Sequence, residues 1–309
     1  MGVRREDTMM ATCALVTLSF LLVVSGVAAT DYDYDNQHKW DGSCNTGSNQ
    51  SPLNFKTVYT SSFPPFIFDN YGLINITLEV NGHSLKANLV PLSSNLPHLL
   101  GGGLSDEYVL DSFHFHWGRN NGEGSEHRLL DCSFAGEMHF VHYKKKYRNV
   151  GEAKEHPDGV AVLAVWLVAA VDDYESKQQL YRYDHDEPTN FWLDFLVPYG
   201  PFVNHFPRQT ILRYLLPQNT DSFYRYEGSL TTPPCSETVV WTVFRDPVVA
   251  PRRLWHLLRT LRSPPGHGRP IGKNFRNIQA QGARKVYFSY DPESHLIQCN
   301  KQEVEELEE

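Results

Sequence analysis

Short runs in which hydrophobic and polar residues alternate recur along this chain, separated by turn-forming residues. The clearest cover residues 73–82, 108–118, 136–143 and 159–171. Alternation with a period of two is typical of strands that turn one face to a core. Strands therefore dominate the prediction, and we expect a mostly β fold of the α+β class.

One segment has the helical period instead. From Ala250 the stretch "APRRLWHLLRTLRS" repeats leucine at helical spacing, Pro251 suits a first helical turn, and "PPG" at 264–266 ends the pattern. Residues 172–210 are rich in charge, aromatics and proline, which predicts surface loops and short helices. No repeat and no linker-like stretch divides residues 31–290, so we expect a single domain there.

Both ends of the chain differ from this domain. In residues 1–30 two arginines precede an apolar run, and small residues follow it, as in a cleaved signal peptide. A retained signal anchor is the alternative, which the shortness of the run disfavours. Residues 291–309 form an acidic tail with no hydrophobic segment. We therefore expect a secreted, soluble protein without a stable membrane anchor.

The net charge and the cysteines narrow the range of possible functions. The 309-residue chain has a formal net charge of -8, and its lysines and arginines look scattered, which argues against a nucleic-acid partner. Export would remove Cys13 and leave four cysteines, which permit three pairings. Of two glycosylation sequons, Asn75 is the better acceptor because Pro52 follows the sequon of Asn49.

The first candidate metal ligands lie in "FHFHWG", residues 113–118. On a strand, His114 and His116 point to one face and can bind one ion. A catalytic zinc characteristically takes three protein ligands and keeps a fourth position open, so a third ligand is needed. "GEMHFVHY" offers His139, with Glu137 on the same face to accept its free ring N–H, while His142 faces the other way.

Five segments in a fixed order carry a family resemblance. "FHFHWG", "GSEHRLL", "GEMHFVHY", "HPDGVAVLAVWL" and "YEGSLTTPPCSETVVWTVF" resemble the α-class carbonic anhydrases, and the likeness spans about residues 40–290. It implies a large, mainly antiparallel, twisted central sheet with short peripheral helices and a conical active-site cavity. It also implies Zn²⁺ held by His114, His116 and His139, and reversible hydration of carbon dioxide to bicarbonate and a proton by a zinc-bound hydroxide.

The resemblance assigns further roles by position. Thr231 would orient the hydroxide, Glu126 would accept the Thr231 proton, and His83 would shuttle protons to solvent, with Asn81 before it. The apolar wall for carbon dioxide would be Val141, Val162, Leu230, Val239 and Trp241, with Thr232 beside the bicarbonate site. Asn274 would support the second zinc histidine through its main-chain carbonyl, and Cys44 would pair with Cys235.

Some positions depart from the family pattern. Ser112 stands where a glutamine usually supports the first zinc histidine, and Lys86 where the family usually carries an uncharged polar residue. The N-terminal tyrosine of the family is Tyr32 or Tyr34. Cys132 and Cys299 have no counterpart, so they pair with each other, bridge to a second chain and make an oligomer, or stay free.

Two other functions use the same fold. A non-catalytic binding module would have lost zinc ligands, whereas this chain keeps all three histidines together with Thr231 and Glu126. A matrix or mineral-associated protein would add repetitive or acidic segments, and this chain has only its short tail. The sequence therefore favours the enzyme.

Overall fold

A computed structural model describes residues 32–91, 95–170, 207–263 and 268–289. The expected signal peptide, the acidic tail and most of the loop-rich stretch 172–210 lie outside these residues. Among the described residues, no helix is long and apolar enough to cross a membrane.

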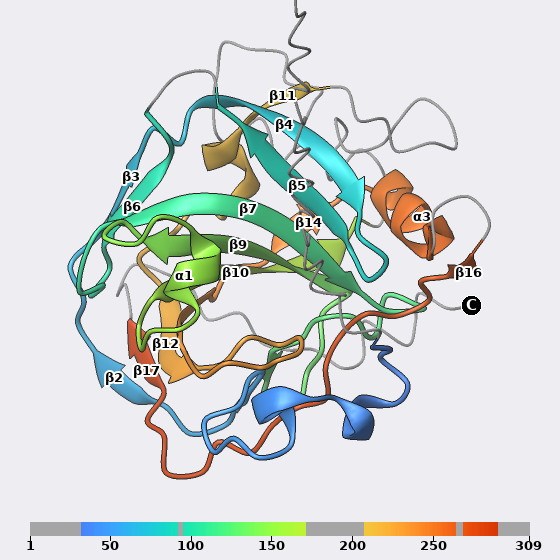
Figure 1. The fold of residues 1–309 in the computed structure, drawn as a ribbon, viewed down its shortest axis with the longest axis horizontal. Helices are drawn as coiled ribbons and strands as arrows, with labels where there is room; N and C mark the ends of the chain where they lie inside the picture. Colours follow the sequence, from blue (N-terminus) through green and yellow to red (C-terminus); the bar gives the residue numbers. More distant parts are fainter. Residues whose placement is uncertain (1–31, 92–94, 171–206, 264–267, 290–309) are drawn as a thin grey trace, which may run out of the picture. The chain divides into compact units, whose positions relative to one another are not determined.

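Thirteen strands form one large sheet at the centre of the described chain (Figure 1). In chain order they are β2 (Tyr59–Ser61), β3 (Phe66–Asp69), β4 (Leu73–Val80), β5 (Leu85–Val90), β6 (His98–Gly101), β7 (Tyr108–Trp117), β9 (Gly136–Lys144), β10 (Val160–Ala169), β11 (Arg208–Ile211), β12 (Phe223–Gly228), β13 (Val239–Phe244), β14 (Val248–Ala250) and β17 (Tyr287–Ser289). The four strands predicted from alternation are β4, β7, β9 and β10, so that prediction is confirmed.

The order of strands in the sheet is β11-β4-β5-β7-β9-β10-β13-β12-β17-β2, with β3, β6 and β14 pairing beside this path. Most neighbours are antiparallel. The exceptions are the pairs of β10 with β13, β10 with β14 and β17 with β2, which are parallel. The predicted twisted, mainly antiparallel sheet is therefore confirmed, and β7, β9 and β10 are its central strands. The conical cavity stays a prediction.

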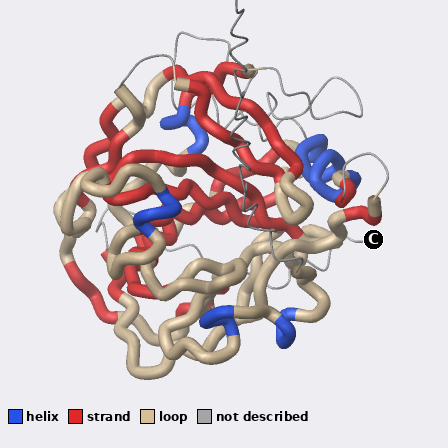
Figure 2. The backbone as a smooth tube through the Cα atoms, in the orientation of Figure 1, coloured by secondary structure: helices blue, strands red, loops and turns tan. Residues whose placement is uncertain are grey.

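Small elements surround this sheet, and the helices lie as short segments around the strands (Figure 2). Two further two-stranded sheets pair β1 (Asn54–Phe55) with β8 (Arg128–Leu129) and β15 (Arg262–Ser263) with β16 (Arg269–Pro270). The helices of the described residues are η1 (Gln37–Lys39), η2 (Gly42–Cys44), α1 (Val150–Ala153), η4 (Leu212–Leu215) and α3 (Arg252–Thr260).

Helix α3 confirms the helix predicted from the leucine repeat after Ala250. It begins two residues after Ala250, which ends β14, and Pro251 is its N-cap rather than its first helical residue. Leu254, Trp255 and Leu258 are buried in the main hydrophobic core. Trp255 packs so closely on β9 that a Cβ at Gly136 would lie 2.9 Å from its ring.

Each central strand is buried on both faces, and the two faces differ. Phe113, Phe115 and Trp117 of β7 are fully buried in the main core, as their alternation predicts. The opposite face carries His114 and His116, and beyond them a second core that contains Val162 and other apolar side chains. Strand alternation thereby separates the structural face of β7 from its histidine face.

A disulfide fastens the N-terminal segment to the loop after β12. Cys44 and Cys235 are bonded, 191 residues apart in sequence, which confirms the pairing that the resemblance implies. The buried Arg276 guanidinium donates to the Cys44 carbonyl at 2.7 Å and to the Ser51 carbonyl at 2.7 Å. The loop after β12 carries Thr231, so the disulfide ties the Thr231 loop to the N-terminal segment.

Candidate metal and catalytic site

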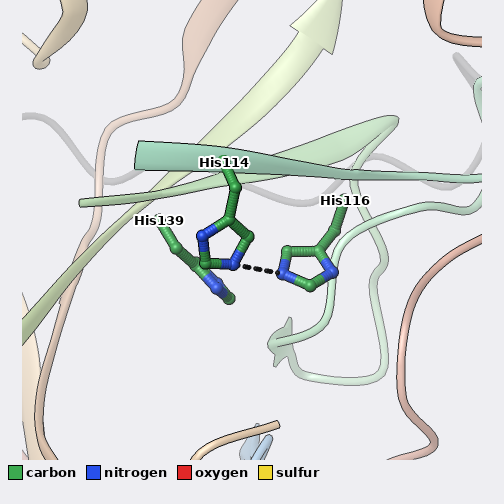
Figure 3. Close-up of side chains that lie close together, drawn as sticks. All are labelled: His114, His116 and His139. Carbon is green, nitrogen blue, oxygen red and sulfur yellow. Dashed lines mark hydrogen bonds between the residues drawn. The ribbon is translucent and has the colours of Figure 1, made fainter. Parts of the chain in front are cut away.

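The pairing of β7 with β9 brings three imidazoles together. In this antiparallel pair His114 lies opposite His139 and His116 lies opposite Glu137. Residues directly opposite each other project to the same face of a sheet. All three histidines therefore point into one space, as Figure 3 shows.

The ring nitrogens are at metal-binding distance. His114 Nε2 lies 3.1 Å from His116 Nε2. If one nitrogen is taken from each of the three rings, these nitrogens all lie within 4.8 Å of one another. In a tetrahedral zinc site with Zn–N bonds of about 2.0–2.1 Å, ligand nitrogens are about 3.3 Å apart. The donor set thus fits Zn²⁺ in type and spacing.

The second nitrogens of two rings are held by hydrogen bonds. His116 Nδ1 lies 2.7 Å from the Asn274 carbonyl, and His139 Nε2 lies 2.6 Å from Glu137 Oε1. Each of these oxygens accepts an N–H, so the tautomers leave His116 Nε2 and His139 Nδ1 with free lone pairs. These contacts are the ones that the sequence assigned to Asn274 and Glu137.

Burial keeps two of the three imidazoles in their metal-binding protonation state. It lowers the pKa of His114 and of His116, so both imidazoles are neutral near pH 7. Burial alone would raise the pKa of Glu137, but the charges and hydrogen bonds of His127 and His139 bring it well below its usual range. Neutral imidazoles beside an ionised carboxylate are what a divalent cation needs.

A buried network behind the histidines was not assigned from the sequence. His127 Nδ1 lies 2.7 Å from Glu137 Oε1, and its Nε2 lies 2.6 Å from the Tyr226 hydroxyl. Because both ring nitrogens are occupied, His127 is a support for Glu137 rather than a metal ligand. It follows Glu126 in "GSEHRLL", but Tyr226 is 99 residues away, so only the fold reveals the contact.

Comparison with known proteins agrees with this geometry. A sequence model described as "Eukaryotic-type carbonic anhydrase" matches residues 35–290. The chain belongs to this family. "Carbonic anhydrase 15" of Mus musculus is 36% identical over 267 residues, which cover 81% of this chain and 77% of that protein.

Further relatives give the same result over more of the chain. "Carbonic anhydrase 12" of Homo sapiens is 34% identical over 86% of this chain and 74% of that protein. "Putative carbonic anhydrase 5" of Caenorhabditis elegans is 32% identical over 88% of this chain and 86% of that protein. The protein is therefore an enzyme, a carbonate dehydratase.

Glu126 lies beside the histidines in this carbonic anhydrase. It is buried, Oε1 accepts the backbone N–H of Arg276 at 2.8 Å, and Oε2 lies 3.9 Å from His139 Nδ1. Among the residues that the structure describes, Oε2 has no hydrogen-bond partner. Thr231, buried in the loop after β12, makes no hydrogen bond to this oxygen, so its relay to Glu126 stays a prediction.

A row of apolar side chains borders the histidines. Val141 lies opposite Val162, Val162 opposite Trp241, and Val160 opposite Val239, across β9, β10 and β13. Val141 is two residues from His139 on the same face, and the Trp241 ring centroid lies 4.9 Å from that of His139. Leu230 is half-buried and packs on the same apolar cluster. The wall residues named from the resemblance thus form one continuous surface.

His83 occupies the turn between β4 and β5. The side chain of Asn81 accepts the N–H groups of His83 at 3.0 Å and Ser84 at 2.8 Å, and Asn274 Nδ2 donates to the His83 carbonyl at 3.0 Å. Tyr32 stacks on the His83 ring with centroids 3.8 Å apart.

Of the two candidate tyrosines, Tyr32 therefore touches His83 directly. Burial raises the pKa of Tyr32 to about 12, and hydrogen bonds with Tyr34 and Thr232 partly oppose this rise. The Tyr32 hydroxyl therefore stays protonated between His83 and the half-buried Thr232.

The two departures from the family pattern meet at Asp111. The Ser112 hydroxyl donates to Asp111 at 2.7 Å, and Lys86 Nζ lies 3.9 Å from the same carboxylate. The Ser112 hydroxyl is thereby engaged away from the first histidine. Lys86 lies opposite His114 in the pairing of β5 with β7, and its charge adds to the burial that lowers the pKa of His114.

Proposed function

We propose that this carbonic anhydrase is a secreted zinc enzyme with a histidine proton shuttle. The observation that carries the proposal is the convergence of three imidazoles, two of which are oriented by Asn274 and Glu137. His114, His116 and His139 would hold Zn²⁺. When bound, the ion supplies an activated water for attack on carbon dioxide.

Glu126 and Thr231 would aim the attacking oxygen. An ionised carboxylate is an acceptor only, and Glu126 Oε1 already receives the Arg276 N–H. Oε2 is therefore left to accept the Thr231 hydroxyl proton. With its proton committed, the Thr231 oxygen accepts a hydrogen bond from the nucleophile and turns a lone pair of that nucleophile toward the substrate.

The apolar row would hold carbon dioxide beside the nucleophile. Val141, Val162, Val239, Trp241 and Leu230 present no charge, which suits a small apolar substrate. The indole N–H of Trp241 is bonded to the Ser229 carbonyl at 3.0 Å, so the ring offers only its apolar surface. Thr232 would offer its hydroxyl to bicarbonate.

Proton release would pass through His83. An imidazole titrates near neutrality, so it can take a proton from the site and give it to buffer. Asn81 and Asn274 fix its backbone, and the Tyr32 ring fixes the plane of its own ring. The shuttle would thereby be held beside Tyr32, whose side chain is hydrogen-bonded to Thr232.

Export is supported by the cysteines. Cys44–Cys235 is a disulfide, and Cys132 is also disulfide-bonded, to a cysteine outside the described residues. Because Cys13 falls in the expected signal peptide, we assign Cys299 as this partner. Structural disulfides are typical of exported proteins. A second bridge within the chain would leave Cys132 and Cys299 unable to link an oligomer.

Glycosylation of Asn75 fits export. Asn75 lies in β4, where it pairs with Val90 of β5 and Gln209 of β11, and the residue is half-buried. Its side-chain oxygen is buried with no hydrogen-bond partner among the described residues. The sugar would be attached to the nitrogen of the same amide.

Stopped-flow measurement of carbon dioxide hydration tests the proposal. The purified chain should lose its activity on chelation and regain it with Zn²⁺, and His114→Ala should be inactive. His38→Ala is the matched control, since His38 is exposed in η1, and should retain wild-type activity. Hydration that survives both chelation and His114→Ala would refute the zinc mechanism.

A further inference from the structure

The cationic residues of this acidic protein are segregated along the chain, not scattered as the sequence first suggested. The whole chain has 28 Lys and Arg against 36 Asp and Glu. Residues 247–290, however, contain nine Lys and Arg and no acidic residue. Such a stretch creates a local positive potential that the net charge of the protein conceals.

The fold gathers the exposed members of this stretch at α3 and at the hairpin after it. Arg252, Arg253 and His256 are exposed on α3, and Arg262 and Arg269 are exposed on β15 and β16. The hairpin starts directly after the helix, and Figure 1 shows α3 and β16 side by side at one edge of the chain. We call these five residues the basic face.

A hollow of about 590 Å³ lies against this face. Arg252, Arg253, His256 and Arg259 line it together with neutral residues, and its described lining contains no carboxylate. Arg259 donates to the Gly118 carbonyl at 3.0 Å and to the Asn121 side chain at 2.7 Å. Both acceptors are neutral, so they fix the guanidinium without cancelling its charge.

The hairpin extends the same pattern. Arg262 donates to the Gly268 carbonyl at 2.9 Å, which is again a neutral acceptor. Some exposed cations on other parts of the described chain pair with carboxylates, as Lys56 does with Asp131 and Arg148 with Glu152. Arg259 and Arg262, whose printed acceptors are neutral, therefore retain charge for an external anion.

We propose that the basic face binds a linear sulfated polysaccharide. Arginine presents a planar fork of donors that matches the oxygens of an anionic group, and a row of arginines on a helix and a hairpin suits a chain with repeated sulfates. Choosing an extracellular polyanion relies on the secretion advanced under the proposed function.

Two other polyanions fit less well. The exposed large hydrophobic residues of the described chain, which are Val58, Tyr59, Ile67, Leu73 and Leu130, all lie outside this face, so it has nothing to insert into a membrane. For a nucleic acid, the choice rests on the proposed secretion, since the net charge of -8 would oppose long-range attraction to either polyanion equally.

Heparin affinity of the full holoenzyme tests the proposal. The variant carries Arg252→Gln, Arg262→Gln and Arg269→Gln, and the matched control carries Lys56→Gln, Lys145→Gln and Arg148→Gln, with the same change in net charge. We expect the first triple variant to bind heparin at least about tenfold more weakly than wild type. The slope of log K against log salt should fall by about 0.7–0.9 for each arginine removed.

The controls separate the possible outcomes. The control triple should bind heparin within about twofold of wild type, and both variants should hydrate carbon dioxide at the wild-type rate. Failure of the zinc mechanism would appear as hydration that survives chelation, whatever the heparin result. Equal heparin affinity of both triples, or tighter binding of duplex DNA or of anionic phospholipid vesicles than of heparin, would overturn the proposal.

Discussion

His142 is predicted to make this enzyme less stable in mild acid. Its ring is fully buried, and its Nδ1 lies 3.0 Å from the Phe140 carbonyl and 3.3 Å from the Ala161 carbonyl. Its Nε2 contacts the Tyr71 hydroxyl. In the neutral ring Nδ1–H donates to the carbonyls and Nε2 accepts from Tyr71.

Burial lowers the pKa of His142 from 6.5 to about 4. Between these values the unfolded chain binds a proton that the folded chain does not, so the free energy of unfolding falls as pH falls. Each pH unit between the two pKa values lowers the free energy of unfolding by about 1.4 kcal/mol, so the full loss is about 3 kcal/mol. From pH 7.5 to pH 5 the loss from this group is about 2 kcal/mol.

Urea unfolding of the metal-free chain at pH 7.5 and pH 5 measures this effect without a contribution from metal release. His142→Gln removes the titrating ring and keeps an acceptor for Tyr71. Between the two pH values its free energy of unfolding should therefore fall by about 2 kcal/mol less than that of wild type. Tyr71→Phe keeps the ring and should retain the wild-type pH dependence. Equal pH dependence of wild type and His142→Gln would refute the reasoning.

Three further predictions concern the site and the cysteines. Thr231→Val and Glu126→Gln should each lower hydration about a hundredfold while zinc stays bound, because the nucleophile loses its orientation; a variant with wild-type turnover would disprove the relay. His83→Ala should hydrate slowly in weak buffer and recover with added imidazole; an unchanged dependence of turnover on buffer would exclude it as the shuttle. Mass spectrometry of a non-reduced digest should find the Cys132 peptide linked to that of Cys299, and a Cys132 peptide linked across two chains would contradict the assignment.

The sequence predicted the features that depend on local periodicity. Alternation in β7 separates His114 and His116 from the core phenylalanines, and β9 repeats the pattern with His139, because side chains alternate along any strand. The leucine repeat likewise identified α3 to within a few residues. The site roles and the disulfide came from the order of five motifs, which the family resemblance supplied.

Features that depend on strand pairing could not be predicted in this way. The support of Glu137 by His127 and Tyr226 needs β12 near β9, and no local pattern specifies that order. A register shift between Leu110 and Ser112 accompanies the Ser112 contact with Asp111, and the sequence gives no sign of it. Folding also brings separated arginines onto one face.

The account depends most on three imidazoles binding one divalent cation. Elemental analysis of the purified chain, matched with His116→Ala, measures this directly. We predict about one zinc per chain in the wild type, because the site has three ligands of the type zinc prefers. We also predict that His116→Ala binds zinc more weakly, because it removes the ligand that Asn274 orients. Wild-type protein that hydrates carbon dioxide yet neither contains nor takes up zinc would contradict the account.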